Sequence, residues 1–202
     1  MKKIIAMLLA LTMLVAFAGC NNTTAPETTE GTNAPETTAA PETTEAATGA
    51  ASALEILETT WNLFGEDEKF FVMGGDFENM VDGAPGAVNV AGVDFLMGNL
   101  IVPEAETANV TEAASLIHAM NANTFTCAAY AVADVQAFAD AMKTAIQGNH
   151  WMCGFPEKLV IAEVGGYVVV MFGHGDAVNP FQTKLTAAYP TTNILVNEAI
   201  TA

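Results

Sequence analysis

Only the part of this chain that follows residue 50 can form a hydrophobic core. Residues 21–50 contain nothing but Asn, Thr, Ala, Pro, Glu and Gly, and the sequence Ala-Pro-Glu-Thr-Thr occurs three times among them. Without aromatic or branched aliphatic residues, this segment buries too little apolar surface to offset the entropy of ordering its backbone. We therefore expect residues 20–50 to be a disordered tether. Residues 51–202 have the ordinary size of a single globular domain.

The segment before the tether has the parts of a secretory signal. Two lysines precede an apolar run over residues 4–17, and Ala18-Gly19-Cys20 closes the segment. A cysteine after two small residues is the pattern at which bacterial lipoproteins are cleaved and acylated, and the apolar run is shorter than the roughly 20 residues that span a bilayer. We expect residues 1–19 to be a lipoprotein signal peptide and Cys20 to carry the lipid. The protein is then extracytoplasmic and lipid-anchored to the bacterial cell membrane.

The charge of the mature chain limits its partners. Removal of the signal peptide leaves four lysines, no arginine and 23 acidic residues, hence a net charge of −19. Affinity for nucleic acid rests on contacts of Lys and Arg with phosphates, so nucleic acid is not an expected partner. The partners that remain are the membrane, reached through the lipid on Cys20, and an envelope protein or a small ligand.

Hydrophobic spacing predicts an α+β domain. Ser52 and Glu55 form a capping box for a helix that ends by Gly65, and residues 70–73 have the composition of a short strand. Short helices and loops are expected over residues 76–103. A helix is predicted over residues 110–121, because apolar residues recur there at helical spacing.

The second half of the domain, residues 123–198, has the element order β-α-β-β-α-β of a ferredoxin-like fold. The predicted strands are residues 124–132, 158–164, 167–172 and 193–196. Asp134 caps the first helix of this half, and Asn179-Pro180 is expected to open the second. Gly165-Gly166 predicts a two-residue hairpin. The N-terminal helices should pack around this sheet.

Three segments of this half also resemble a known family. The helix that Asp134 opens, the turn Trp151–Pro156 and the hairpin Gly166–Val169 are similar to those of an uncharacterised family of small lipoproteins from anaerobic Gram-positive bacteria. The similarity covers roughly residues 111–186, and such chains are sometimes labelled bacteriocin transport accessory proteins. That label implies a thioredoxin-like redox role. The resemblance assigns no catalytic residue.

The predicted topology brings together one group of candidate binding residues. The loop that enters the second strand and the loop that leaves the third should lie at the same end of the sheet. The residues concerned are His150, Trp151, Cys153, Phe155, His174 and Asp176. Aromatic side chains there could wall an organic binding site. The set His150-x-x-Cys153 with His174-x-Asp176 is also an acceptable group of zinc ligands. Roles in turns and in the core explain the same residues, however, and we expect no bound cofactor.

The cysteines leave two further alternatives open. Cys127 and Cys153 could form a disulfide, which an exported domain permits, or could be ordinary buried thiols. A redox enzyme would need Cys153 as its nucleophile, but residues 157–161 after it have the composition of a strand rather than of an activating helix. Most of the methionines beyond the signal segment are expected in the core.

These observations favour a non-enzymatic function without deciding it. The leading hypothesis is a lipid-anchored accessory module of the cell envelope that binds a ligand or partner. The alternative is a thiol-redox or metal-dependent enzyme centred on Cys153, His150 and His174.

Overall fold

The computed structural model describes residues 49–201, in which all the helices and strands below lie. The helices are α1 (Ala53–Trp61), α2 (Val93–Gly98), α3 (Glu104–Thr107), α4 (Val135–Gln147) and α5 (Gly175–Ala188). The strands are β1 (Val72–Gly74), β2 (Val81–Asp82), β3 (Gly86–Val88), β4 (Val110–His118), β5 (Phe125–Val132), β6 (Lys158–Val164), β7 (Tyr167–Gly173) and β8 (Asn193–Ala199). The predicted signal peptide, Cys20 and nearly all of the tether lie outside the described residues. Within residues 49–201, no helix is both long enough and apolar enough to cross a membrane.

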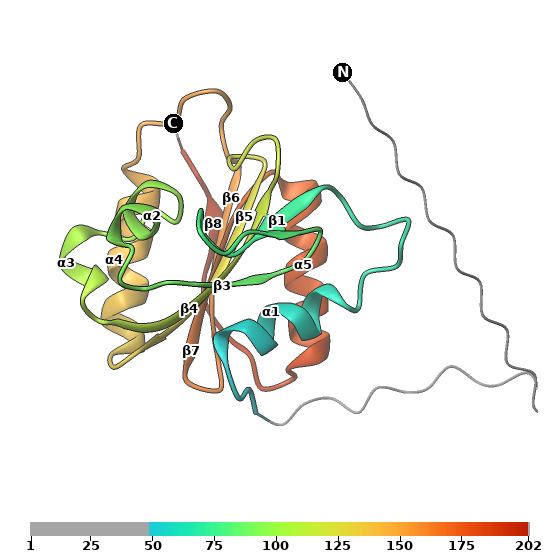
Figure 1. Ribbon diagram of the computed structural model, residues 1–202, viewed down its shortest axis with the longest axis horizontal. Coiled ribbons are helices and arrows are strands. Elements are labelled where there is room, and N and C mark those ends of the chain that lie inside the picture. The colour runs from blue at the N-terminus through green and yellow to red at the C-terminus, as the bar shows by residue number, and fades with distance from the viewer. Residues whose placement is uncertain (1–48, 202) are drawn as a thin grey trace, which may run out of the picture. The chain divides into compact units, whose positions relative to one another are not determined.

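A single antiparallel sheet runs through the middle of the domain, with helices on both faces (Figure 1). Its strand order is β2-β1-β4-β5-β7-β6-β8, and β3 pairs separately with β4. Each strand pair is antiparallel. The prediction of an α+β domain is therefore confirmed.

Each face of the sheet has its own hydrophobic core. One core lies under α1 and α5, where Phe125 and Phe181 pack at a ring distance of 5.3 Å. The other lies under α2 and α4, where Phe138 packs on Tyr130 at 5.1 Å. Both cores are built within residues 49–201, so this part of the chain contains what it needs to fold on its own.

The predicted ferredoxin-like half is present in its element order along the chain, but its strand order differs. In a ferredoxin-like sheet the fourth strand lies beside the first, whereas β8 lies beside β6 and away from β5. The connections β5–α4–β6 and β7–α5–β8 therefore both run toward the β8 edge of the sheet, but they start from strands that point in opposite directions. Because such connections share one handedness, their helices lie on opposite faces of the sheet. This is why α4 and α5 cover different cores.

The helix predicted over residues 110–121 is wrong, because these residues form β4. Residues 113–116 are all buried, since the layers of both faces cover the centre of the sheet. A strand covered on both faces shows a continuous apolar run, and periodicity cannot separate such a run from a buried helix. Small alanines at Ala113 and Ala114 strengthened the helical pattern.

The predicted start of the last helix is also wrong, because α5 begins at Gly175 and holds Pro180 in its interior. Two contacts fix the earlier start. The amide of Gly175 donates to Glu157 Oε2 at 3.0 Å, and the carbonyl of His174 accepts from Val178 N at 3.0 Å. The first turn also buries Ala177 and Val178 in the core.

The two ends of the sheet differ in what they carry. The described part of the chain begins at the end that holds the β6–β7 hairpin, where Tyr167 Oη donates to the carbonyl of Ala51 at 3.2 Å. We call this the hairpin end. The opposite end, which we call the loop end, carries residues 119–124 between β4 and β5 and residues 148–157 between α4 and β6. Figure 1 shows these loops, together with the C-terminus, at the top of the view.

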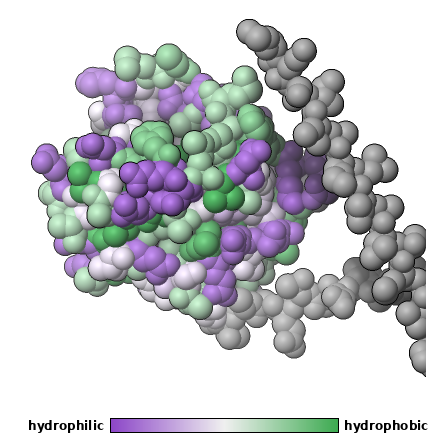
Figure 2. All heavy atoms as spheres, in the orientation of Figure 1, coloured by the Kyte–Doolittle hydropathy of each residue, from purple (hydrophilic) through white to green (hydrophobic). Residues whose placement is uncertain are grey.

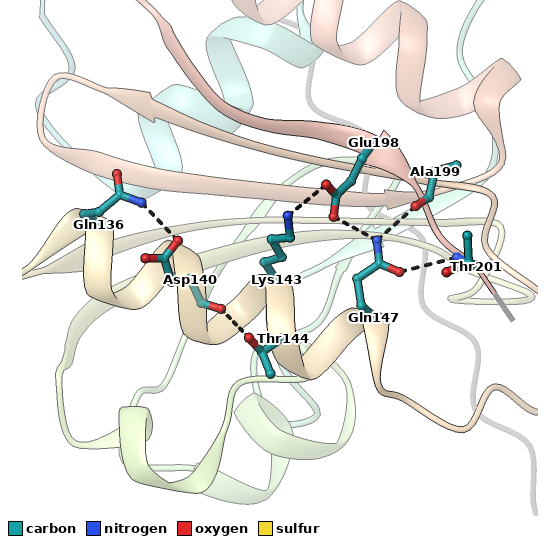
Figure 3. A network of polar contacts seen from close by, with 8 residues as sticks. All are labelled: Gln136, Asp140, Lys143, Thr144, Gln147, Glu198, Ala199 and Thr201. Carbon is teal, nitrogen blue, oxygen red and sulfur yellow. Dashed lines mark hydrogen bonds and ion pairs between the residues drawn. The ribbon is translucent and has the colours of Figure 1, made fainter.

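A polar network fastens β8, the edge strand, to α4 (Figure 3). Lys143 Nζ donates to Glu198 at 2.9 Å, and Gln147 Nε2 donates both to Glu198 and to the carbonyl of Ala199 at 2.9 Å. The amide of Thr201 returns a bond to Gln147 Oε1 at 3.3 Å. These hydrogen bonds from Lys143 and then Gln147 hold the pKa of Glu198 below its ordinary value.

Replacing Glu198 with glutamine is expected to cost less than about 1 kcal/mol at neutral pH, because the pair is partly exposed and screened by solvent. A lowered pKa stabilises the fold at pH values above the ordinary carboxyl pKa, and that stability is lost as the pH falls through the folded-state pKa. Urea unfolding of wild type and E198Q should therefore converge in acid. A difference that stays constant down to the pH at which the carboxylate is protonated would contradict this assignment.

Candidate binding site at the loop end

Side chains from the β4–β5 loop fix the conformation of the 148–157 loop. Asn121 Nδ2 donates to the carbonyl of Cys153 at 2.8 Å. Asn123 Nδ2 donates to the carbonyls of Met152 at 2.8 Å and Gly154 at 3.0 Å. Cys153 itself has a φ of 62°, in the left-handed region that non-glycine residues seldom occupy. The asparagines satisfy the carbonyls of this strained turn and hold it against the rest of the loop end.

Two adjoining cavities, which we call the tryptophan cavities, lie beside this loop. Their volumes are about 180 and 300 Å³, and they share Asn149, His150 and Trp151. The ring of Trp151 packs on Phe172 at 5.4 Å. Its Nε1 is buried without a hydrogen-bond partner among residues 49–201. Buried N–H groups are nearly always paired, so an acceptor from water or a ligand would satisfy this one.

A third cavity, the methionine cavity, continues from the tryptophan cavities across the loop end. Its volume is about 220 Å³, and it shares Asn99 and Ala122 with one of them. Its apolar walls come from β1, α2, β4 and the segment after β1. They are Met73, Phe77, Met80, Phe95 and Ile117. The cavity is open to solvent on one side, where Met80 is 55% exposed.

A fourth cavity, the acidic cavity, adjoins the methionine cavity. It has a volume of about 160 Å³ and shares Asp76, Phe77 and Phe95 with it. Glu78 and Asp94 also line it. The rings of Phe77 and Phe95 meet edge to face at 5.1 Å and form the wall between the two cavities.

Asp76 organises the backbone around the acidic cavity. Its Oδ2 accepts from the amide of Asn89 at 2.6 Å, and its Oδ1 accepts from the amides of Glu78 and Asn79, both at 2.9 Å. Burial raises the pKa of Asp76, but these backbone hydrogen bonds outweigh it and leave the pKa below its ordinary value. Asp76 therefore carries a negative charge at neutral pH.

Large apolar side chains stand exposed around these cavities. Phe77 is 70% exposed, Met152 80% and Phe155 54%. Met120, in the β4–β5 loop, is also largely exposed. On the face of the domain that carries α2 and β3, apolar residues shown in green lie among hydrophilic ones (Figure 2). Exposed apolar residues that gather around connected cavities mark an interaction surface, whereas single ones need no explanation.

Three of the candidate residues predicted from the sequence line one cavity, and His174 lies at the same end of the sheet, where its amide donates to the carbonyl of Thr124 at 2.8 Å. His150, Trp151 and Phe155 line one tryptophan cavity. His174 and Asp176 lie at the start of α5, which packs on the other face of the sheet. Nowhere in residues 49–201 do three His, Cys, Asp or Glu side chains approach closely enough to hold a metal ion.

The two cysteines of the domain are free thiols. Cys127 is fully buried under α1 and α5, and burial raises the pKa of its thiol. Cys153 is exposed at the loop end. Its neighbour along the chain, Trp151, packs against the other core, which lies under α2 and α4. The disulfide considered from the sequence is therefore not formed in the structure, because the sheet separates the surroundings of the two residues.

The methionine and acidic cavities were not predicted from the sequence. The expectation that most methionines beyond the signal segment lie in the core is wrong, since only Met142 and Met171 are buried. The available signal was the segment from Asp76 to Asn99, where Phe and Met recur without helical or strand periodicity. Apolar residues in an irregular, glycine-rich segment need not reach the core.

Comparisons of the chain with protein-family models, with curated proteins and with solved structures gave no match.

Proposed function

We propose that this chain is a lipid-anchored, extracytoplasmic accessory module of the cell envelope that binds a partner through the cavities of its loop end. The observation that carries the proposal is the continuity of four cavities edged by exposed Phe and Met side chains. Binding sites combine such apolar walls with a few polar groups, which here are asparagines and carboxylates. The resemblance to small envelope lipoproteins agrees with this role.

The arrangement of the domain supports the same proposal. The described chain begins beside the hairpin end, where the Cβ of an alanine at position 165 would come within 3.3 Å of Ala50 N. An anchor attached through residues 20–48 would therefore join the domain at the hairpin end. The loop end would then be the end farther from the attachment point, accessible to partners.

The alternative, a thiol-redox or metal-dependent enzyme, has less support. Cys153 lies in a loop that leads to Pro156 and then to a strand, and no helix begins there to stabilise a thiolate. His150 lines the tryptophan cavities, whereas His174 lines none of the four cavities. A binding module should tolerate Cys153→Ala with unchanged partner capture, whereas an enzyme of this kind should lose its turnover.

Photocrosslinking in the producing cells tests the proposal. A benzophenone amino acid is placed in the full-length, lipidated chain at Met80 or Phe155, which line different cavities of the series. We expect both positions to give an adduct with the same envelope component. The matched control is Ala187, which is exposed on α5 away from the cavities.

Two results decide the outcome. Phe77→Ser, which removes an exposed ring from the wall of two cavities, should reduce the adduct formed from both positions. Adducts of equal yield from Ala187, or none from Met80 and Phe155, would contradict a binding role of the loop end.

A further inference from the structure

We propose that the partner is a cationic, amphipathic peptide segment, whose basic side chain enters the acidic cavity while a neighbouring apolar side chain enters the methionine cavity. This inference rests on the proposed function and names the chemistry of its partner. It follows from the charges, the apolar walls and the sizes of the two adjoining cavities.

The acidic cavity has the chemistry of a site for a Lys or Arg side chain. Asp76, Glu78 and Asp94 line it, and the carboxylates of Glu78 and Asp94 accept no hydrogen bond from any described residue. Two unpaired carboxylates beside a charged, buried one create a negative potential at its opening. The aromatic wall of Phe77 and Phe95 adds a surface on which a cation is attracted by the ring quadrupole.

The methionine cavity has the chemistry of a site for an apolar side chain. Met73, Met80 and Ile117 supply flexible and branched aliphatic walls. Methionine adapts its shape to different apolar partners, which is why it is common on surfaces that bind amphipathic peptides. With a volume of about 220 Å³, the cavity is smaller than the roughly 300–1,000 Å³ typical of small-molecule sites. A series of small cavities suits successive side chains of a polypeptide.

The rest of the domain offers no cation to compete for the acidic cavity. Lys69, Lys143 and Lys184 form ion pairs with Glu66, Glu198 and Glu68 at 2.8–2.9 Å. Lys158, the remaining lysine, donates to Asn179. None of these four lines any of the four cavities.

Charge also selects against two other occupants of the cavities. The chain's own tether, residues 20–50, contains glutamates and no basic residue. A second copy of the domain would bring the same excess of acidic groups. Both would be repelled by the acidic cavity, whereas a basic peptide would be attracted and oriented by it.

Fluorescence anisotropy with a defined probe tests the inference. The protein is the fragment 49–202, and the probe is a short synthetic peptide of Lys, Leu and Ala with Lys and Leu on opposite faces of a helix. We expect this peptide to bind, and its counterpart with Glu in place of Lys to bind at least about tenfold more weakly. Added salt should weaken the binding, since the contacts with Glu78 and Asp94 are exposed.

Variants locate the contacts. The double variant Glu78→Gln with Asp94→Asn should weaken binding of the Lys peptide about fivefold and reduce its dependence on salt. Met80→Ser should weaken it by a similar factor through lost apolar contact. The matched control, Glu58→Gln with Glu104→Gln, removes the same charge from exposed positions outside the cavities and should leave the affinity unchanged.

The outcomes separate this inference from the proposed function. Equal binding of the Glu and Lys peptides, equal effects of the two double variants, or no binding of the Lys peptide would overturn the cationic assignment. In each of these cases, adducts from Met80 and Phe155 in cells would still support a binding role. Loss of those adducts together with retained peptide binding would instead overturn the proposed function.

Discussion

Replacing Cys20 with alanine is expected to abolish incorporation of labelled palmitate into the chain. The thiol of Cys20 is the group that the acyl anchor would use, and within residues 49–201 no helix is long and apolar enough to cross a membrane. Two or more acyl chains give stable attachment, while a chain without them has only weak affinity for a membrane. The net charge of −19 expected for the chain without its signal peptide also opposes binding to anionic headgroups.

Palmitate labelling followed by fractionation of the producing cells measures this effect. Asn21→Ala, which changes the neighbouring residue and keeps the thiol, is the control and should leave labelling and membrane attachment intact. Labelling of the Cys20→Ala chain at the level of the wild type would show that the lipid is carried elsewhere.

Replacing Phe125 with alanine is expected to lower the free energy of unfolding by about 4 kcal/mol, which is the usual cost of removing a buried aromatic ring. Phe125 is inaccessible to solvent at the start of β5, with the ring of Phe70 at 5.2 Å and that of Phe181 at 5.3 Å. It therefore joins the segment before β1 to α5. The layers that pack around the Phe125 ring are held in place by the sheet and cannot collapse fully into the space that the ring leaves.

Urea denaturation followed by tryptophan fluorescence, to which buried Trp61 and half-buried Trp151 both contribute, measures this change. Phe71→Ala is the matched control, because the Phe71 side chain is 58% exposed and its loss should change the stability by no more than about 0.5 kcal/mol. A loss below about 2 kcal/mol for Phe125→Ala would show that the core under α1 and α5 rearranges to fill the space.

The elements that could be predicted from sequence are those in which local signals agree. The helix α4 has Asp134 as its N-cap, an apolar stripe at helical spacing and Gly148 at its end, and it forms as expected. The same is true of the β6–β7 hairpin, where Gly165 and Gly166 adopt positive φ values of 58° and 91°. Each of these signals is contained within a few residues.

The features that could not be predicted depend on distant parts of the chain. The sequence of β4 is compatible with a helix, and contacts with β1, β3 and β5 decide its conformation. No residue near β8 indicates which edge of the sheet it will join, because a right-handed connection can cross the sheet in either direction.

The candidate site shows the same division between local and distant signals. His150, Trp151 and Phe155 lie close along the chain, so a turn could be expected to gather them. The methionine cavity combines Met73, Phe95 and Ile117, which lie far apart in the sequence and meet only after β1, α2 and β4 have packed. The spacing of these residues along the sequence therefore does not predict that they lie together.

If the chain is exported as proposed, the order of the strands has a consequence for its passage through a secretion channel, where the chain emerges beginning at its N-terminus. β5 lacks its second neighbour until β7 has emerged, because β7 lies between β5 and β6 in the sheet. α1, the first helix of the domain, packs against α5 near the other end of the chain. Neither core can close before most of the domain has left the channel. The topology therefore delays the completion of both cores until most of the domain has emerged.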